Sequence, residues 1–118
     1  MRRAYKYRLY PTRHQEAALT AMLETHRRLY NSALEQRKSA YEQTHQCVTY
    51  CQQSAWMKER RREDPFLART NFSSCQATLR RLDRAFQAFF RRVKAGEKPG
   101  YPRFKGRSRF DSVEFPSY

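Results

Sequence analysis

The stretch from Phe72 to Lys94 constrains the fold most strongly, because its apolar and basic residues separate onto opposite faces of a helix. With a step of about 100° per residue and Arg80 set at zero, the apolar residues fall on an arc from roughly 180° to 280°. These residues are Cys75, Leu79, Leu82, Phe86, Phe89, Phe90 and Val93. The basic residues occupy the opposite arc, and they are Arg80, Arg81, Arg84, Arg91, Arg92 and Lys94. The sequence therefore predicts a helix that packs through one face and presents a ridge of guanidinium groups on the other.

This ridge favours contact with a polyanion. Asp83 is the only acid in the helix, whereas solvated helix faces normally mix both signs of charge. The planar guanidinium fork of arginine suits the oxygens of a phosphate group. We therefore interpret Arg80, Arg84 and Arg91 as nucleic-acid-binding residues, with an ordinary solvated surface helix as the alternative.

A second basic segment follows this helix, which Gly96 and Pro99 are expected to end. Aromatic residues are interleaved with cations in GYPRFKGRSRF, where Pro102 and the glycines exclude a helix. An extended basic strip with stacking rings is a common way to track a nucleic-acid backbone. A disordered basic tail is the alternative interpretation. The residues assigned to binding in this strip are Arg103, Lys105, Arg107 and Arg109.

The charge balance of the whole chain favours the same class of partner. The 118 residues carry a formal net charge of +14, which opposes compaction unless a polyanion neutralises it. The chain has no apolar run of membrane-spanning length and starts without the apolar segment of a secretory signal. Its three cysteines, an odd number, suit a reducing compartment better than a disulfide framework. We predict a cytoplasmic, single-domain protein with no membrane partner; a basic amphipathic chain on an anionic membrane surface is the alternative.

The amino-terminal half predicts a strand followed by a long helix. Residues 4–10 alternate in the manner of a half-buried strand, and Thr12 with Gln15 forms a capping-box pattern. An apolar stripe then continues over a helix from about residue 13 to residue 43. His26 lies within this stripe and is interpreted as a core histidine. Arg37 also lies on the stripe and needs a partner if it is buried.

The remaining elements are expected to be short. Residues 44–54 and the stretch around Pro65 are interpreted as loops, with a short helix between them anchored by Trp56. Residues 111–115 are expected to form a last strand that pairs with residues 4–10. The predicted fold is mainly α: an antiparallel helical bundle inserted between short N- and C-terminal β-strands. The two long apolar stripes are expected to pack antiparallel to each other.

No catalytic centre is evident in the sequence. It contains no glycine-rich phosphate loop and no nucleophile elbow, and its eleven acids are scattered among basic residues. Metal-dependent nucleases instead hold divalent ions with clustered carboxylates. Cys47 and Cys51, near His45 and with Cys75 further on, make a zinc site conceivable, but their spacing does not match common zinc motifs. We predict no catalytic residues, no metal and no cofactor.

Three segments together resemble one family, the TnpB (OrfB) proteins of insertion sequences, in their amino-terminal part. The segments are RLYPTRHQEAAL, RLYNSALEQRKSAYE and QATLRRLDRAFQAFFRRVKAGEKPGYPRFKGRSRFDS. The family consists of transposon-encoded RNA-guided DNA endonucleases, and its start is often labelled a helix-turn-helix domain. The resemblance implies a split wedge barrel with a helical recognition domain inserted between its strands. On this chain it implies a first wedge strand at 1–11, a helical recognition domain at 12–95 and a basic return segment at 96–118.

The resemblance also implies partners and two site residues. In the family this region binds a guide RNA and reads a short target-adjacent motif in double-stranded DNA. Tyr50 matches a family tyrosine that approaches that DNA, and Gln76 matches a glutamine that contacts bases. The stretch THRRLYN departs from the family pattern, which usually has Gly and Cys before Tyr-Asn.

The family's RuvC-like nuclease and zinc ribbon are expected to lie beyond the end of this chain. The chain therefore looks like a truncated TnpB, a nucleic-acid-binding fragment without catalysis of its own. Three origins fit this interpretation: a gene remnant, an autonomous DNA-binding regulator, or one half of a split nuclease whose other half is a separate chain.

Overall fold

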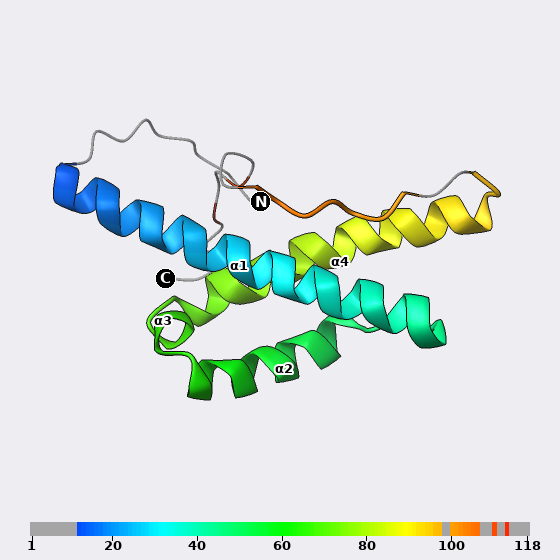
Figure 1. The fold of residues 1–118 in the computed structure, drawn as a ribbon, viewed down its shortest axis with the longest axis horizontal. Helices are drawn as coiled ribbons and strands as arrows, with labels where there is room; N and C mark the ends of the chain where they lie inside the picture. The colour runs from blue at the N-terminus through cyan, green and yellow to red at the C-terminus, as the bar shows by residue number, and fades with distance from the viewer. Residues whose placement is uncertain (1–11, 98–99, 107–109, 111–112, 114–118) are drawn as a thin grey trace, which may run out of the picture.

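The structure is a computed structural model that describes residues 12–97, 100–106, 110 and 113. Within these residues the chain forms helices and coil, and Figure 1 shows how the helices are arranged. The two long helices lie side by side and cross at a shallow angle, while the shorter ones pack along one side of the pair. The helices are α1 (Arg13–Thr44), α2 (Tyr50–Glu63), α3 (Pro65–Ala68) and α4 (Phe72–Lys94).

Helix α1 confirms the predicted long helix and its start. The Thr12 hydroxyl accepts a hydrogen bond from the Gln15 backbone N–H at 3.2 Å, and the Gln15 side chain accepts one from the Thr12 N–H at 3.0 Å. This capping box satisfies two backbone donors that the first helical turn would otherwise leave free. The helix ends at His45, which adopts the left-handed conformation with φ 56°.

Helix α4 also spans the predicted residues, and its end follows the expected pattern. Gly96 has a φ of +74°, a region that favours glycine. The Gly96 N–H donates to the Val93 carbonyl at 3.2 Å, and the Glu97 N–H donates to the Arg92 carbonyl at 3.1 Å. These two bonds form a Schellman motif, which satisfies carbonyls that the last turn leaves free.

The prediction of a loop from 44 to 54 is wrong in its second part, because α2 already begins at Tyr50. Thr49 and Gln52 form a second capping box, with the Gln52 N–H donating to the Thr49 hydroxyl at 3.2 Å. The hydrophobic pattern of the sequence does not mark the start of this helix, because α2 has almost no apolar stripe. Its buried residues are Gln53 and Met57. Its end at Glu63 lies close to the predicted one.

The predicted loop around Pro65 contains the single-turn helix α3. The Asp64 carboxylate accepts hydrogen bonds from the N–H groups of Phe66 and Leu67 at 3.0 and 3.3 Å, which caps the helix. Pro65 stands at the first helical position, where a missing N–H costs nothing. Pro65 is therefore part of a helix start.

The expected antiparallel packing of the two long helices is wrong. Early residues of α1 contact early residues of α4, as in the hydrogen bond between His26 Nε2 and Ser74 Oγ at 2.8 Å. Late residues contact late residues, as in the edge-on pair of Tyr41 and Phe89 rings at 5.7 Å. The two helices therefore run in the same direction (Figure 1). The reason is α2, which is long enough to carry the chain back along the pair before α4 begins.

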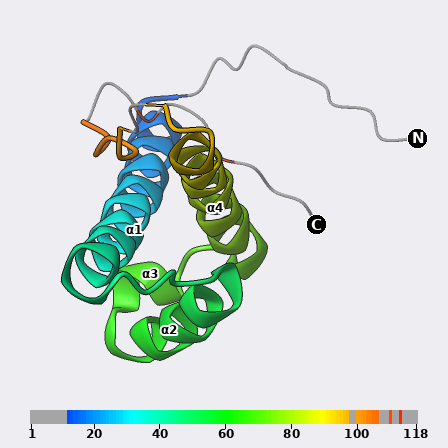
Figure 2. The same ribbon diagram turned by 90° about the vertical axis from the view of Figure 1, so that its right-hand side faces the viewer.

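The predicted strand–helices–strand fold class is also contradicted, because the described residues contain no strand. Residues 4–10 lie outside the described part, as do most of 111–115. The return segment instead runs as coil over the two long helices, on the side opposite α2 (Figure 2). Tyr101 stacks on Phe89 with ring centroids 4.7 Å apart, and Phe110 is buried beside Tyr30. In the described part of this segment, Tyr101 and Phe110 therefore dock onto the two long helices.

The core lies between α1, α2 and α4 and contains a buried histidine, as the sequence predicted. His26 is fully buried, and its Nδ1–H donates to the Met22 carbonyl at 2.7 Å. Because a carbonyl only accepts, the Nδ1 atom carries a proton, and Nε2 lies 2.8 Å from the Ser74 Oγ atom. Burial lowers the pKa of His26 below its ordinary value of 6.5, since the charged ring would lose its hydration.

We expect His26 to make folding stability depend on pH. Its folded pKa is lowered, so its contribution is complete above pH 6.5 and is lost as pH falls toward the folded pKa. The free energy of unfolding should decrease by at most about 1.4 kcal/mol per pH unit in that window, the value for one proton. Urea unfolding of the parent and of His26→Gln between pH 7.5 and 5.5 measures this slope. A slope unchanged by His26→Gln, and equal to that of the exposed-site control His14→Gln, would refute the assignment.

Candidate nucleic-acid interface

The arginine ridge predicted on α4 is present as a narrow line of exposed side chains. Arg80, Arg84 and Arg91 are exposed, and Gln87 completes the line between the last two. Their spacings of four, three and four residues place them on one face of the helix. Within the described part of the chain, none of these three arginines forms an ion pair. The ridge is therefore a row of cations with uncompensated charge.

Asp83, the only acid of α4, does not neutralise this row, because it is turned toward the core. Its carboxylate accepts a hydrogen bond from Arg37 Nη2 at 2.9 Å and one from Gln87 Nε2 at 2.8 Å. Arg37 is buried, and its Nε–H also donates to Gln53 Oε1 at 2.6 Å. The partner that Arg37 was predicted to need is thus Asp83, together with Gln53.

Several cations on the other helices are paired with nearby acids. Glu24 on α1 accepts hydrogen bonds from both Arg27 and Arg28. These bonds, that from Arg27 above all, lower the pKa of Glu24 from 4.5 to about 2 and keep it ionised. On α2, Arg62 lies 3.5 Å from the Glu59 carboxylate. These three arginines thus have carboxylate partners, unlike the ridge arginines of α4 within the described residues.

Tyr50 meets the amino-terminal end of the ridge. The Arg80 guanidinium lies 5.1 Å from the centroid of the Tyr50 ring, which is a cation–π contact. The Tyr50 hydroxyl is buried and has no hydrogen-bond partner within the described residues. Gln76 is half-buried and lies one turn before Arg80 on α4. The structure therefore brings Tyr50 against Arg80 and places Gln76 on the same helix close by.

The basic strip of the return segment is held by α1. The Lys105 N–H donates to Asn31 Oδ1 at 2.8 Å, and its carbonyl accepts from Asn31 Nδ2 and Arg27 Nη1, both at 3.0 Å. The Lys105 ammonium lies 5.8 Å from the centroid of the Tyr30 ring, whereas Arg103 is exposed. Arg107 and Arg109 lie outside the described residues. Within the described strip, Arg103 is thus the cation that is free of α1.

Sequence reasoning missed the residues that hold this strip. Asn31 and Arg27 sit among the polar positions of a long helix, and their partner is more than seventy residues away in the chain. The sequence predicted Arg81 on the exposed basic face of α4. It is instead half-buried, with its guanidinium 4.7 Å from the centroid of the Phe110 ring. No local pattern marks such contacts, because both partners look like surface residues in isolation.

The three cysteines are far from alike in their surroundings. Cys47 and Cys51 are exposed, whereas Cys75 is buried beside the Thr70 hydroxyl, with burial raising its thiol pKa. In the part of the chain that the structure covers, no three His, Cys, Asp or Glu side chains gather as a metal-binding group. The described helices also include none that is long and apolar enough to cross a membrane.

Comparisons with known proteins show which family this chain is similar to. Residues 1–46 match the family model of the helix-turn-helix domain of OrfB proteins of the IS605 type. The described part of this match, from residue 12 onward, consists of α1 and the first two residues after it. The helix-turn-helix label thus coincides here with one continuous helix.

Two curated relatives match nearly the whole chain. One, from Streptomyces pristinaespiralis, is 36% identical over 92% of this chain and 26% of its own length. The other, InsQ from Escherichia coli, is 28% identical over 96% of this chain and 27% of its own length. Both are provisionally named RNA-guided DNA endonucleases, and the chain spans about a quarter of the length of each. The resemblance drawn from the sequence is therefore confirmed, and this chain is a relative of the OrfB (TnpB) proteins, matched over about a quarter of their length.

Proposed function

We propose that this chain is a nucleic-acid-binding part of a TnpB-type RNA-guided DNA endonuclease. It holds guide RNA and target-adjacent double-stranded DNA and does not cleave DNA by itself. The relatives' names supply the activity class of the whole protein, and the chain's own surface supplies the argument for binding.

The observation that carries this proposal is the uncompensated arginine row of α4. Arg80, Arg84 and Arg91 are exposed on one line, and the only acid of their helix is committed to Arg37. Folding alone does not require such a row, because like charges on one face repel and lower stability. Phosphate groups along a nucleic-acid backbone would neutralise the row and gain bidentate contacts.

Base reading is assigned to the amino-terminal end of the row. Tyr50 and Gln76 flank Arg80 there, so a base edge could meet an amide and a ring while Arg80 holds the adjacent phosphate. The buried Tyr50 hydroxyl without a partner is a donor that a ligand could satisfy. Arg103 and Lys105, with Arg107 and Arg109 beyond the described residues, supply further backbone contacts.

The test is the salt dependence of binding. Fluorescence anisotropy with a labelled hairpin RNA and with a duplex DNA should show affinity falling steeply with salt, at a log–log slope of about 0.7 to 0.9 per phosphate contacted. The double variant Arg84→Gln with Arg91→Gln should flatten that slope by roughly 1.4 to 1.8, twice the value for one contact. Gln76→Ala, selected on a randomised duplex library, should change the preferred sequence more than the average affinity.

Arg62→Gln is the matched control for Arg84→Gln, because both remove one exposed helical arginine. Arg62 is paired with Glu59, so its loss should leave the slope nearly unchanged. Equal effects of the two single variants would show that binding responds to net charge only. Magnesium-dependent cleavage by the purified chain would contradict the proposal of binding without catalysis.

A further inference from the structure

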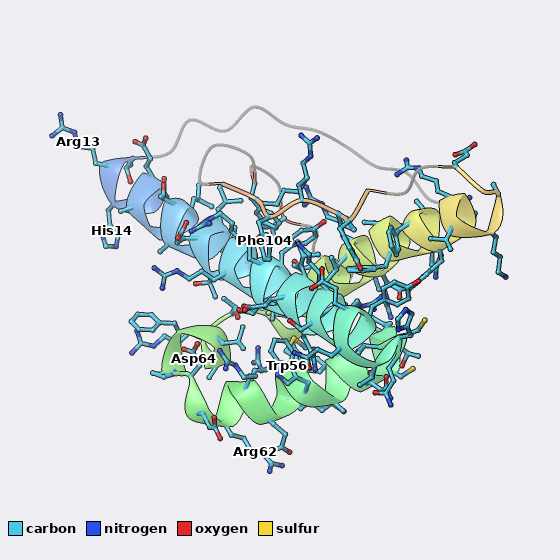
Figure 3. All side chains as sticks on the ribbon, turned by 45° about the vertical axis from the view of Figure 1, so that its right-hand side comes forward. Arg13, His14, Trp56, Arg62, Asp64 and Phe104 are labelled. Carbon is cyan, nitrogen blue, oxygen red and sulfur yellow. The ribbon has the colours of Figure 1, made fainter. Side chains whose placement is uncertain are left out.

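A cavity of about 370 Å³ opens between α1, α2 and α3. None of its described lining residues comes from α4, so it is separate from the arginine row. Figure 3 shows Trp56 lying between α1 and α2, with Asp64 at the turn into α3. The floor includes the buried side chains of Leu29 and Leu67. The volume falls within the range of pockets that hold small planar ligands.

Two aromatic rings border this cavity, and each is stacked with an arginine. The Arg60 guanidinium lies 5.6 Å from the centroid of the Trp56 ring, and that of Arg69 lies 6.0 Å from the centroid of Phe66. Phe66 is 68% exposed, although most large apolar side chains of the described core are buried. The Phe66 ring is therefore not held in place by burial in the core. Aromatic rings that border a cavity offer surfaces on which a planar ligand can stack.

The rim of the cavity carries charge that suits a nucleotide. Arg28 is 72% exposed and pairs with Glu24 at 3.3 Å, whereas Arg60 is exposed without an ion pair in the described part of the chain. Glu24 stays ionised at the same rim, so it offers an acceptor to an amino group on a base edge. The Asp64 carboxylate is already occupied by two backbone N–H groups of α3. The rim thus carries two carboxylates and two guanidinium groups, and Arg60 is the one of the four without an ion pair or a backbone N–H partner among the described residues.

We propose that this cavity binds one unpaired nucleobase of a bound RNA, with Trp56 and Phe66 as its stacking surfaces and Arg60 on an adjoining phosphate. The proposal rests on the proposed nucleic-acid function and adds to it a second contact region, lined by residues outside α4. An apolar side chain of a protein partner would use the rings but would gain nothing from the arginines at the rim. Unpaired bases of folded RNA combine a flat apolar face with an adjacent negative charge.

Trp56 makes the experiment specific, because it is the only tryptophan in the chain. Its fluorescence should be quenched saturably by adenosine 5′-monophosphate and, at lower concentration, by a short single-stranded oligoadenylate. A fully paired RNA of matched length should bind without comparable quenching. Phe66→Ala should raise the half-saturating concentration of the mononucleotide by about tenfold, because one stacking surface is lost. Phe104→Ala is the matched control, since Phe104 is 52% exposed and lies outside the cavity.

Anisotropy measured in parallel separates this proposal from the proposed function. Single-stranded RNA that binds by anisotropy while Trp56 fluorescence stays constant would overturn the cavity assignment and leave the general function intact. Loss of RNA affinity in the Arg84→Gln, Arg91→Gln variant with unchanged mononucleotide quenching would support two separate contact regions. A Trp56 response to an apolar leucine-rich peptide but not to the mononucleotide would overturn the proposal in favour of a protein partner.

Discussion

Replacing Phe86 by alanine should lower the free energy of unfolding by about 3–5 kcal/mol, the range for deleting a buried phenyl ring. Phe86 is 1% exposed and lies at the centre of the core. Its ring is 6.1 Å from that of Phe89, and the Arg37 guanidinium lies 5.4 Å from its centroid. The substitution therefore removes apolar burial, an aromatic pair and a cation–π contact together. Since small domains are stable by only about 5–15 kcal/mol, this loss is a large fraction of the total stability.

Urea unfolding followed by far-ultraviolet circular dichroism measures this loss. Phe86→Leu keeps most of the buried volume and should cost less than about 1.5 kcal/mol. Phe104→Ala removes the same atoms from a side chain that is 52% exposed, so it should have a small effect. A loss below about 1 kcal/mol for Phe86→Ala would show that the apolar face of α4 is not the main core.

Replacing Asp83 by alanine should cost about 3 kcal/mol, because it leaves a buried cation without its carboxylate. The Arg37 side chain is 4% exposed and Asp83 is 23% exposed, so some water reaches the pair and the loss lies at the low end of the range for buried pairs. The bond joins α1 to α4, and Arg37 also donates to Gln53 on α2. The expected effect is thus loosening of the interface between the three helices.

Two further variants test this explanation with the same unfolding measurement. Asp83→Asn retains an oxygen acceptor for Arg37 without the charge, so it should cost less than Asp83→Ala. Gln87→Ala removes only the exposed partner of Asp83 and should change stability by less than about 0.5 kcal/mol. If Asp83→Ala is as mild as Gln87→Ala, the buried arginine is satisfied by Gln53 alone.

The same bond links stability to the proposed function. Asp83 lies between Arg80 and Arg84 in the sequence, yet its carboxylate forms an ion pair with the buried Arg37. The ridge keeps its full positive charge as a result. In Asp83→Ala the ridge arginines remain, so nucleic-acid binding by the folded fraction should persist. A loss of affinity with folding intact would mean that the Arg37–Asp83 bond also positions α4 for binding.

The two long helices could be predicted from the sequence because their information is local. The apolar period of α4, the Thr12 capping box and the glycine after Lys94 each lie within a few residues of the structure that they specify. His26 and Arg37 were identified for the same reason, as polar residues on an apolar stripe. The short helix between the loops was predicted, but the first turn of α2 was missed because its buried residue is the polar Gln53, which bonds the Ala33 carbonyl and Arg37 on another helix.

The direction of packing and the course of the return segment depended on contacts between distant residues. An apolar stripe specifies which face packs, but it fits a parallel or an antiparallel neighbour equally well, and the length of α2 decided between them. Likewise, the alternation in the return segment fits both a strand and a docked coil. Asn31 supplies the hydrogen bonds that a neighbouring strand would have supplied, since it binds both main-chain groups of Lys105. The sequence by itself determined which residues are basic, helical or buried, and the tertiary structure decided which of the basic residues remain free, because pairing requires partners that only folding brings together.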